Sequence, residues 1–234
     1  MKINNIAITA ATLALAIVAS ANAAAPVALP AAKSAYTFDP FVSAEVGIVN
    51  GGLHNNTAGI GSFGKFKSEV GGGFTAGVLL NQHHEFSVST GYVEFEGTPV
   101  VTPGIESTNG KVEQVPVLFN YAYHMPIDSK GMWTVYGGPT IGVIHQTTSL
   151  TTTQLGGTPA FLIGTNSVSD NLLAFGATVG VNAKLSSHWT VGASAQVLEV
   201  ASSSGVPFAG TTQNLLGTGS ATRTFFALTA GYSW

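Results

Sequence analysis

The stretch 172–185, Leu-Leu-Ala-Phe-Gly-Ala-Thr-Val-Gly-Val-Asn-Ala-Lys-Leu, alternates between two kinds of side chain. A period of two is typical of a β-strand whose faces meet different surroundings. In a soluble sandwich the water-facing side is rich in Lys, Glu and Arg, whereas small residues fit the interior of a narrow barrel. One face here carries Phe175, Ala177, Val179, Val181, Ala183 and Leu185, and the other carries Ala174, Gly176, Thr178, Gly180, Asn182 and Lys184.

The same alternation recurs in eight runs along the chain. A tilted strand needs about 9–11 residues to cross a bilayer, and each run reaches that length. The runs lie at 41–49, 69–80, 85–95, 112–123, 133–145, 172–185, 189–200 and 222–234.

Composition excludes several other classes of protein. Only 8% of the 234 residues are charged, 45% are hydrophobic, and the mean hydropathy is +0.33. Soluble domains carry about 25% charged residues, so an ordinary water-facing surface and a disordered chain are both excluded. No stretch after the N-terminal segment has the roughly 18 apolar residues of a membrane helix, and a net charge of −3 disfavours a nucleic-acid partner. The sequence predicts an all-β, eight-stranded antiparallel up-and-down transmembrane β-barrel.

The N-terminus reads as a targeting segment. Lys2 precedes the apolar run 6–19, and Ala21-Asn22-Ala23 is a small-x-small cleavage pattern. We expect a signal peptide over 1–23, an Ala/Pro-rich lead-in over 24–35 and the barrel domain over 36–234.

The connections between runs alternate in length. Outer-membrane barrels have short periplasmic turns and longer external loops, so this order predicts the orientation. The short links are 81–84, 125–132 and 186–188, and the long ones are 50–68, 96–111, 146–170 and 201–221.

Aromatic residues give an independent indication, because their rings favour the boundary between hydrocarbon and headgroups. Those that open strands after short turns, or close strands before them, fall on one side. We predict a periplasmic aromatic girdle of Phe86, Tyr121, Tyr123, Trp133 and Trp189, with Tyr232 and Trp234 at the same level.

Three segments carry a family resemblance: Val115–Tyr123 (VPVLFNYAY), Val135–Gly142 (VYGGPTIG) and Phe226–Trp234 (FALTAGYSW). Together they resemble the small outer-membrane β-barrel superfamily of OmpA-like, OmpX-like and opacity-protein barrels. The resemblance implies a place in the outer membrane, with membrane lipid and lipopolysaccharide as surroundings. It also implies recognition by the barrel-assembly machinery through Leu228, Tyr232 and Trp234. Because the sequence stops at Trp234, we expect no cell-wall-binding domain after the barrel.

Strand parity places a set of polar side chains inside the barrel. A charge in a narrow lumen needs a partner, so we expect Glu45 to pair with Arg223 or Lys184. The alternative is that these charges reach water at the rims. The predicted lumen network comprises Glu45, Lys184, Arg223, Gln114, Asn120, Asn182 and Gln196, with Ser194 beside it.

The sequence gives little indication of a catalytic or metal-binding site. Barrels of this size include lipid A deacylases and palmitoyltransferases, and His145 with Ser149 is the best local pair for acyl transfer, but no carboxylate lies near it in sequence. His83 and His84 are adjacent and would point apart on a strand. We expect no catalytic residue, no cofactor and no metal site, and therefore no enzyme.

The long connections carry the remaining functional possibilities, since binding residues concentrate on loops of a rigid scaffold. We expect a porin-like surface antigen of the cell envelope, a monomer with a side-chain-filled lumen. Its four long external loops would serve adhesion to a host or surface ligand, or envelope integrity. The alternatives are a lipid A-modifying enzyme, a small-solute channel and a soluble lipocalin-like barrel. The loops hold Thr147–Thr153 with the apolar residues Leu155, Phe161, Leu162, Ile163, Val206, Phe208, Leu215 and Leu216, and these segments could instead prolong the strands as hairpins.

Overall fold

The computed structural model describes residues 36–50, 68–97, 100–102, 106–154, 164–203, 206–207, 214–215 and 221–234. The predicted signal peptide and lead-in, His54 and the loop residues Leu155, Phe161, Leu162, Ile163, Phe208 and Leu216 lie outside these ranges. Eight long strands form the barrel: β1 (Phe38–Asn50), β2 (Glu69–Leu80), β3 (His84–Glu96), β5 (Glu106–Pro126), β6 (Trp133–Gln154), β7 (Gly164–Lys184), β8 (Trp189–Val200) and β11 (Ala221–Ser233).

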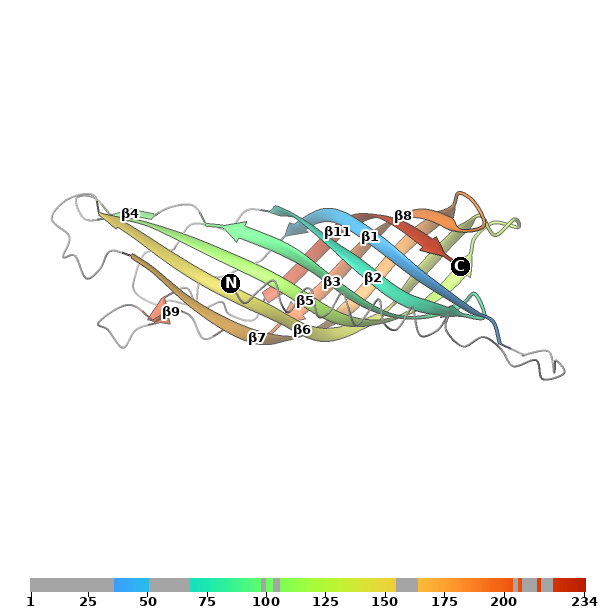
Figure 1. The fold of residues 1–234 in the computed structure, drawn as a ribbon, viewed down its shortest axis with the longest axis horizontal. Helices are drawn as coiled ribbons and strands as arrows, with labels where there is room; N and C mark the ends of the chain where they lie inside the picture. Colours follow the sequence, from blue (N-terminus) through green and yellow to red (C-terminus); the bar gives the residue numbers. More distant parts are fainter. Residues whose placement is uncertain are drawn as a thin grey trace.

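The strands close into a cylinder, as the sequence predicts. Each pairs antiparallel with its neighbours in the order β3-β2-β1-β11-β8-β7-β6-β5, and an additional β3–β5 pairing completes the ring. Figure 1 shows the long strands running side by side along one axis. No helix among the described residues is long and apolar enough to cross a membrane.

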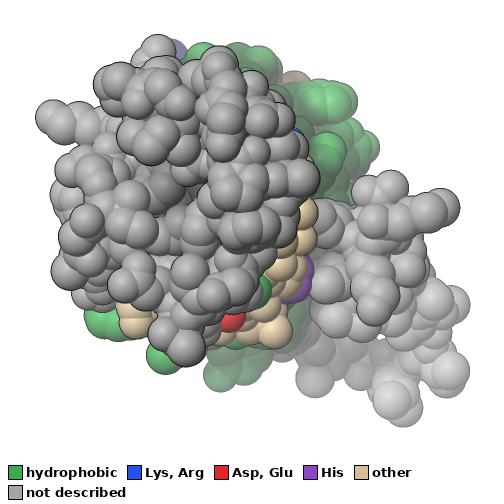
Figure 2. All heavy atoms as spheres, turned by 90° about the vertical axis from the view of Figure 1, so that its left-hand side faces the viewer, with side chains coloured by type: hydrophobic (Ala, Val, Ile, Leu, Met, Phe, Trp, Pro, Cys, Tyr) green, Lys and Arg blue, Asp and Glu red, His purple; other side chains and the backbone are tan. Residues whose placement is uncertain are grey.

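The ladder registers separate an inside from an outside. Glu45 lies opposite Thr229 and Gly73, so odd-numbered residues of β1, β2 and β11 share one face. The even-numbered residues of these strands point outward, as do the odd-numbered residues of β5, β6 and β7, and large apolar side chains are exposed there. This apolar belt includes Val46, Ile48, Val70, Phe74, Phe119, Ile141, Phe175, Val179, Phe226 and Leu228. Figure 2, which looks onto one end, shows hydrophobic side chains along the wall behind it.

The two ends of the barrel differ. Short connections at 81–83, 127–132 and 185–188 define what we name the turn end, and the opposite end is the loop end. In the connection at 127–132, the Asp128 carboxylate accepts hydrogen bonds from the backbone N–H of Trp133 at 2.8 Å and of Met132 at 3.2 Å. The bond from Trp133 is the main cause of a pKa below the usual range for Asp128.

Three strands are much longer than the sequence predicts. β5 and β7 have 21 residues each and β6 has 22, against 12 or 13 in the other five barrel strands. Much of the expected loop 146–170 is therefore strand, and the alternative of a prolonged hairpin is correct for Thr147–Thr153. Short strands accompany the loop end: β4 (Val100–Thr102) pairs with β5, and β9 (Val206–Pro207) pairs with β10 (Asn214–Leu215).

Candidate functional site

A buried arginine crosses the lumen in its loop-end half. Arg223 of β11 is 4% exposed, and its guanidinium donates to Gln114 Oε1 of β5 and, at 3.3 Å, to Gln146 Oε1 of β6. Gln114 Nε2 also donates to Gln146 Oε1 at 2.6 Å, and Gln146 Nε2 donates to Thr148 at 3.2 Å. Hydrogen bonds thus join opposite walls of the barrel, and we name these four residues the arginine plug.

Apolar side chains fill the space around the arginine plug. They come from the inward faces of the barrel strands, so this half of the lumen is packed like a protein core. One cluster comprises Leu118, Ile144, Leu172, Ala174, Leu198 and Val200, and the other comprises Val49, Val93, Phe95 and Val112, with Phe225 packed against it.

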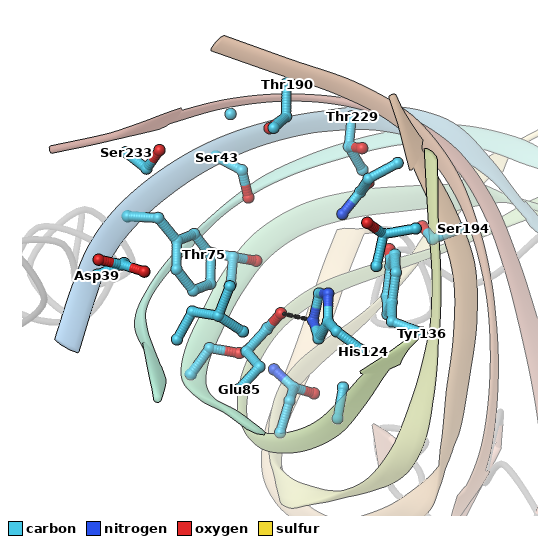
Figure 3. A pocket seen from close by; sticks show the side chains of 18 of the residues that line it. Asp39, Ser43, Thr75, Glu85, His124, Tyr136, Thr190, Ser194, Thr229 and Ser233 are labelled. Carbon is cyan, nitrogen blue, oxygen red and sulfur yellow. Dashed lines mark hydrogen bonds and ion pairs between the residues drawn. The ribbon is translucent and has the colours of Figure 1, made fainter. Parts of the chain in front are cut away.

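The turn-end half of the lumen is hollow. A cavity of ≈ 500 Å³ lies there, so the expectation of a wholly side-chain-filled lumen is wrong for this half. Its walls are mainly hydroxyl, amide and carboxylate side chains, because the inward positions carry small polar residues. Figure 3 shows Ser43, Thr75, Tyr136 and Ser194 around this space.

An ion pair and an aromatic stack line one wall of this turn-end cavity. His124 Nε2 of β5 lies 2.8 Å from Glu85 Oε2 of β3, the dashed contact in Figure 3. The His124 ring stacks on Tyr136 of β6 with centroids 5.0 Å apart and planes 12° apart. Gly180 of β7 lies opposite Tyr136. A Cβ at Gly180 would clash with the Tyr136 ring, so the observed ring position requires glycine there.

The predicted lumen residues all lie on inward positions, but they do not form one network. Gln114 and Arg223 belong to the arginine plug. Asn120 donates to Ser89 at 3.1 Å and accepts from Thr140 at 2.9 Å, while Gln196 donates to Thr178 at 2.9 Å. Glu45, Asn182, Gln196 and Lys184 line the turn-end cavity.

The expected ion pair between Glu45 and Arg223 or Lys184 is not found among the described residues. Glu45 lies opposite Thr229 on β11, and Arg223 is six residues from Thr229 along the same strand. Six strand residues span roughly 20 Å. Arg223 therefore meets the two glutamines at its own level instead of the carboxylate.

Sequence reasoning missed the inward roles of Glu85, His124, Tyr136 and Gln146. Parity alone could have placed Glu85 inside, since its neighbour Phe86 was predicted to face outward. The partner of Glu85 follows only from the lateral register between β3 and β5.

The other histidines make local contacts. His145 Nδ1 lies 2.9 Å from Asn171 Oδ1, and Ser149 is four residues further along the same strand, roughly 13 Å away. His83 Nδ1 approaches the His124 carbonyl oxygen at 2.9 Å, and His84 Nδ1 approaches the Tyr121 hydroxyl at 2.9 Å. Within the described residues, no three His, Asp or Glu side chains converge as metal ligands would.

The predicted girdle and assembly residues lie on outward positions towards the turn end. Phe86 packs on Tyr121 with ring centroids 5.3 Å apart, and Tyr232 packs on Trp189 and Trp234 at 5.2 and 5.4 Å. Tyr123, Trp133 and Leu228 are exposed on the same outer surface.

Comparisons with known proteins identify several distantly similar structures and one family. Similar solved structures include Neisserial surface protein A (10% identity, 85% of this chain and 99% of that chain, TM-score 0.47). They also include Ail, the attachment invasion locus protein of Yersinia pestis (14%, 83% and 98%, TM-score 0.44), and OprG from Pseudomonas aeruginosa (11%, 84% and 95%, TM-score 0.49). No curated protein sequence is significantly similar to the chain. The sequence profile of the outer membrane protein beta-barrel domain matches residues 11–233, so the chain belongs to that family and is a protein of the cell outer membrane.

Proposed function

We propose that this outer-membrane barrel is a surface-interaction protein, which anchors a sheet outside the cell for adhesion or recognition. The outer parts of β5, β6 and β7, residues 106–111, 147–154 and 164–170, form what we name the platform. The platform and the adjoining loops would contact the partner, and the barrel would hold them in place.

The observation that carries this proposal is the length of three adjacent strands. A bilayer needs about 9–11 residues of a tilted strand, whereas β5, β6 and β7 have 21, 22 and 21 residues. About ten residues of each strand therefore lie outside the hydrocarbon, and those in the platform extend roughly 20–26 Å along the strand at the loop end. Figure 1 shows this three-stranded wall reaching towards the loop end beyond β2 and β3.

The platform surface is suited to hydrogen bonding. Thr147 and Ser169 pair through their hydroxyls at 3.0 Å, as do Thr151 and Thr165, and both pairs are exposed on the outer face. Hydroxyls donate and accept hydrogen bonds without charge. Such a surface favours a partner rich in polar uncharged groups, such as a glycan or a polar protein surface.

The arginine plug and its apolar surroundings favour a scaffold over a small-solute channel. Phe95, Val112 and Ala174 are fully buried within the lumen, and hydrogen bonds cross it at Arg223. For the lipid A-modifying alternative, the described residues provide no serine at hydrogen-bond distance from His145.

The remaining partners in this proposal follow from the outer-membrane location. The apolar belt would contact membrane lipid and lipopolysaccharide, and the C-terminal residues Leu228, Tyr232 and Trp234 would present the chain to the barrel-assembly machinery. Because closure of the sheet leaves no free barrel edge, we propose a monomer.

Most of the β6–β7 part of the platform can be removed without opening the barrel. Thr148 and Val168 lie opposite each other in the β6–β7 ladder, so an Asn-Gly turn can replace residues 149–167 and keep Thr148 of the arginine plug. Bacteria expressing the full chain should adhere to immobilised glycans or to cultured epithelial cells more than those expressing this deletion. A heat-dependent gel shift would verify that the deletion still forms a barrel. Equal adhesion of the two strains would refute the proposal.

A second pair of variants distinguishes the contribution of the hydroxyl groups to adhesion from that of the sheet itself. The double variant Thr151→Val/Thr165→Val keeps the strand shape and removes one hydroxyl pair, whereas Thr151→Ser/Thr165→Ser keeps the hydroxyls. We expect adhesion to fall in the valine variant and to persist in the serine variant.

A further inference from the structure

The turn-end cavity has the size and the position of a ligand site. Its volume of ≈ 500 Å³ lies within the range of about 300–1,000 Å³ that small-molecule pockets occupy. The connecting residues Gln82, Gly131 and Ser187 line its mouth, so it opens at the end that faces the periplasm in barrels of this kind. The arginine plug and the apolar clusters close its other end.

Glu45, a carboxylate in this cavity, has no side-chain partner in the part of the chain that the structure describes. Glu45 lines both the turn-end cavity and a smaller one of ≈ 70 Å³ next to Arg223, which places it at the inner end of the larger space. Among the described residues, no side chain forms an ion pair or hydrogen bond with the Glu45 carboxylate. Glu85, a second carboxylate in the lumen wall, is already held by His124. A half-buried carboxylate without a partner favours a cation beside it.

The charged side chains that face the cavity also favour a cation. Three carboxylates, those of Asp39, Glu45 and Glu85, face the cavity, against the one ammonium group of Lys184. Lys184 is the last residue of β7, two residues from Asn182. Arg223, which lies beside the inner end, donates to Gln114 and Gln146 and not to Glu45.

The walls near Glu45 offer further acceptors. Thr229 lies directly opposite Glu45 in the ladder, and Ser194 and Asn182 line the same cavity. On the other neighbouring strand stands Gly73, where a Cβ would lie 3.1 Å from Glu45 Oε1, so glycine leaves the carboxylate its room. A primary ammonium group has three donors, which a carboxylate and two hydroxyl or amide oxygens can satisfy together.

We propose that the turn-end cavity binds a small organic cation with a primary ammonium group, with Glu45 as its counter-ion. The ligand would enter from the periplasmic side, and the hydroxyl and amide oxygens around Glu45 would accept its remaining N–H bonds. This site is separate from the platform and does not depend on adhesion.

The test uses the full mature chain, refolded in detergent in an amine-free phosphate buffer. The probe is n-butylammonium, titrated by calorimetry, with butan-1-ol and butyrate as a neutral and an anionic molecule of similar size. We expect saturable binding of butylammonium and none of the other two. In a ¹³C-labelled sample, the Glu45 carboxyl signal should shift along the same binding curve.

Three variants assign the site. Glu45→Gln should weaken butylammonium binding at least tenfold, and Lys184→Gln should strengthen it several-fold by removing a competing cation. Glu113→Gln, on the outer face near the loop end, is the matched control and should bind like the unchanged protein. A heat-dependent gel shift would establish that each variant folds.

Several results would overturn the proposal. These are the absence of saturable binding, equal binding of butan-1-ol, or unchanged affinity in Glu45→Gln. A Glu45 carboxyl signal that does not move in the unchanged protein would also overturn it, and that measurement needs no variant to fold.

Discussion

His124 and Glu85 form a contact of 2.8 Å between side chains that are 8% and 15% exposed, inside a barrel wall whose inward surface is otherwise mostly uncharged. The pair ties β5 to β3 near the turn end. Removing one member of a buried pair leaves the other without compensation and costs about 3–5 kcal/mol. Because a cavity borders this pair, we expect the lower part of that range.

Glu85→Ala should therefore lower the free energy of unfolding by about 3–4 kcal/mol, measured by urea titration in lipid vesicles. The double variant Glu85→Ala/His124→Ala should lose less than the sum of the single losses. Glu94→Ala is the matched control, since Glu94 pairs with Lys111 at 2.9 Å on the exposed outer surface. That exposed pair should contribute less than about 1 kcal/mol. Additive losses at Glu85 and His124 would contradict the pairing.

Gly180 and Tyr136 should also be coupled. Gly180→Ala would push its Cβ into the Tyr136 ring, and overpacking of this kind costs about 1–3 kcal/mol. In a Tyr136→Ala background the same substitution should cost much less, because the ring is gone. Unfolding of all four proteins by urea gives the coupling energy, and an equal cost in both backgrounds would show that the ring does not lie against Gly180.

The stability cost of introducing a charged side chain on the outer face should depend on how deep in the membrane the residue lies. Val179 is 58% exposed on the outward face of β7, so Val179→Arg should destabilise the barrel by about 2–4 kcal/mol in a bilayer. Ser169→Arg lies on the same face of the same strand, ten residues towards the loop end. Being in the platform, it should cost under 1 kcal/mol. Similar costs at both positions would contradict the assignment of belt and platform.

The fold was largely readable from the sequence, because lipid on one side and a crowded lumen on the other impose a period of two. All eight barrel strands were predicted, and most of their bounds differ little from those observed. The prolonged parts of β6 and β7 were expected to be loop. Thr147–Thr153 carries no apolar alternation, because its outward side chains are hydroxyls and the inward Thr148 is buried in the arginine plug, so the stretch resembles a loop in sequence.

The sequence predicts which side chains face the lumen, but not at which height along the barrel axis each of them lies. Parity correctly turns Glu45 and Arg223 inward, but the stagger of a tilted barrel decides which inward residues meet. That stagger brings Arg223 to Gln114 and Gln146 and leaves Glu45 beside the cavity. The Glu85–His124 pair was missed for the same reason, since its members are 39 residues apart in sequence.

The C-terminal aromatic residue should matter for assembly more than for stability. Trp234→Ala should reduce the amount of protein in the outer membrane several-fold while leaving refolding in detergent intact. Trp133→Ala is the control, because Trp133 is an exposed aromatic residue outside the C-terminal segment. Immunoblots of membrane fractions compare the two, and equal yields would contradict a role of Trp234 in recognition by the assembly machinery.

Surface labelling tests the central claim, that the platform stands outside the cell and the short turns face the periplasm. The chain has no cysteine, so Thr165→Cys in the platform and Ser129→Cys in a turn each introduce a single reactive thiol. A maleimide linked to a 5 kDa polymer, too large for the intact outer membrane, is added to whole cells. The account predicts that Thr165→Cys is labelled in intact cells and Ser129→Cys only after the outer membrane is permeabilised. Labelling of Ser129→Cys but not Thr165→Cys in intact cells would contradict it.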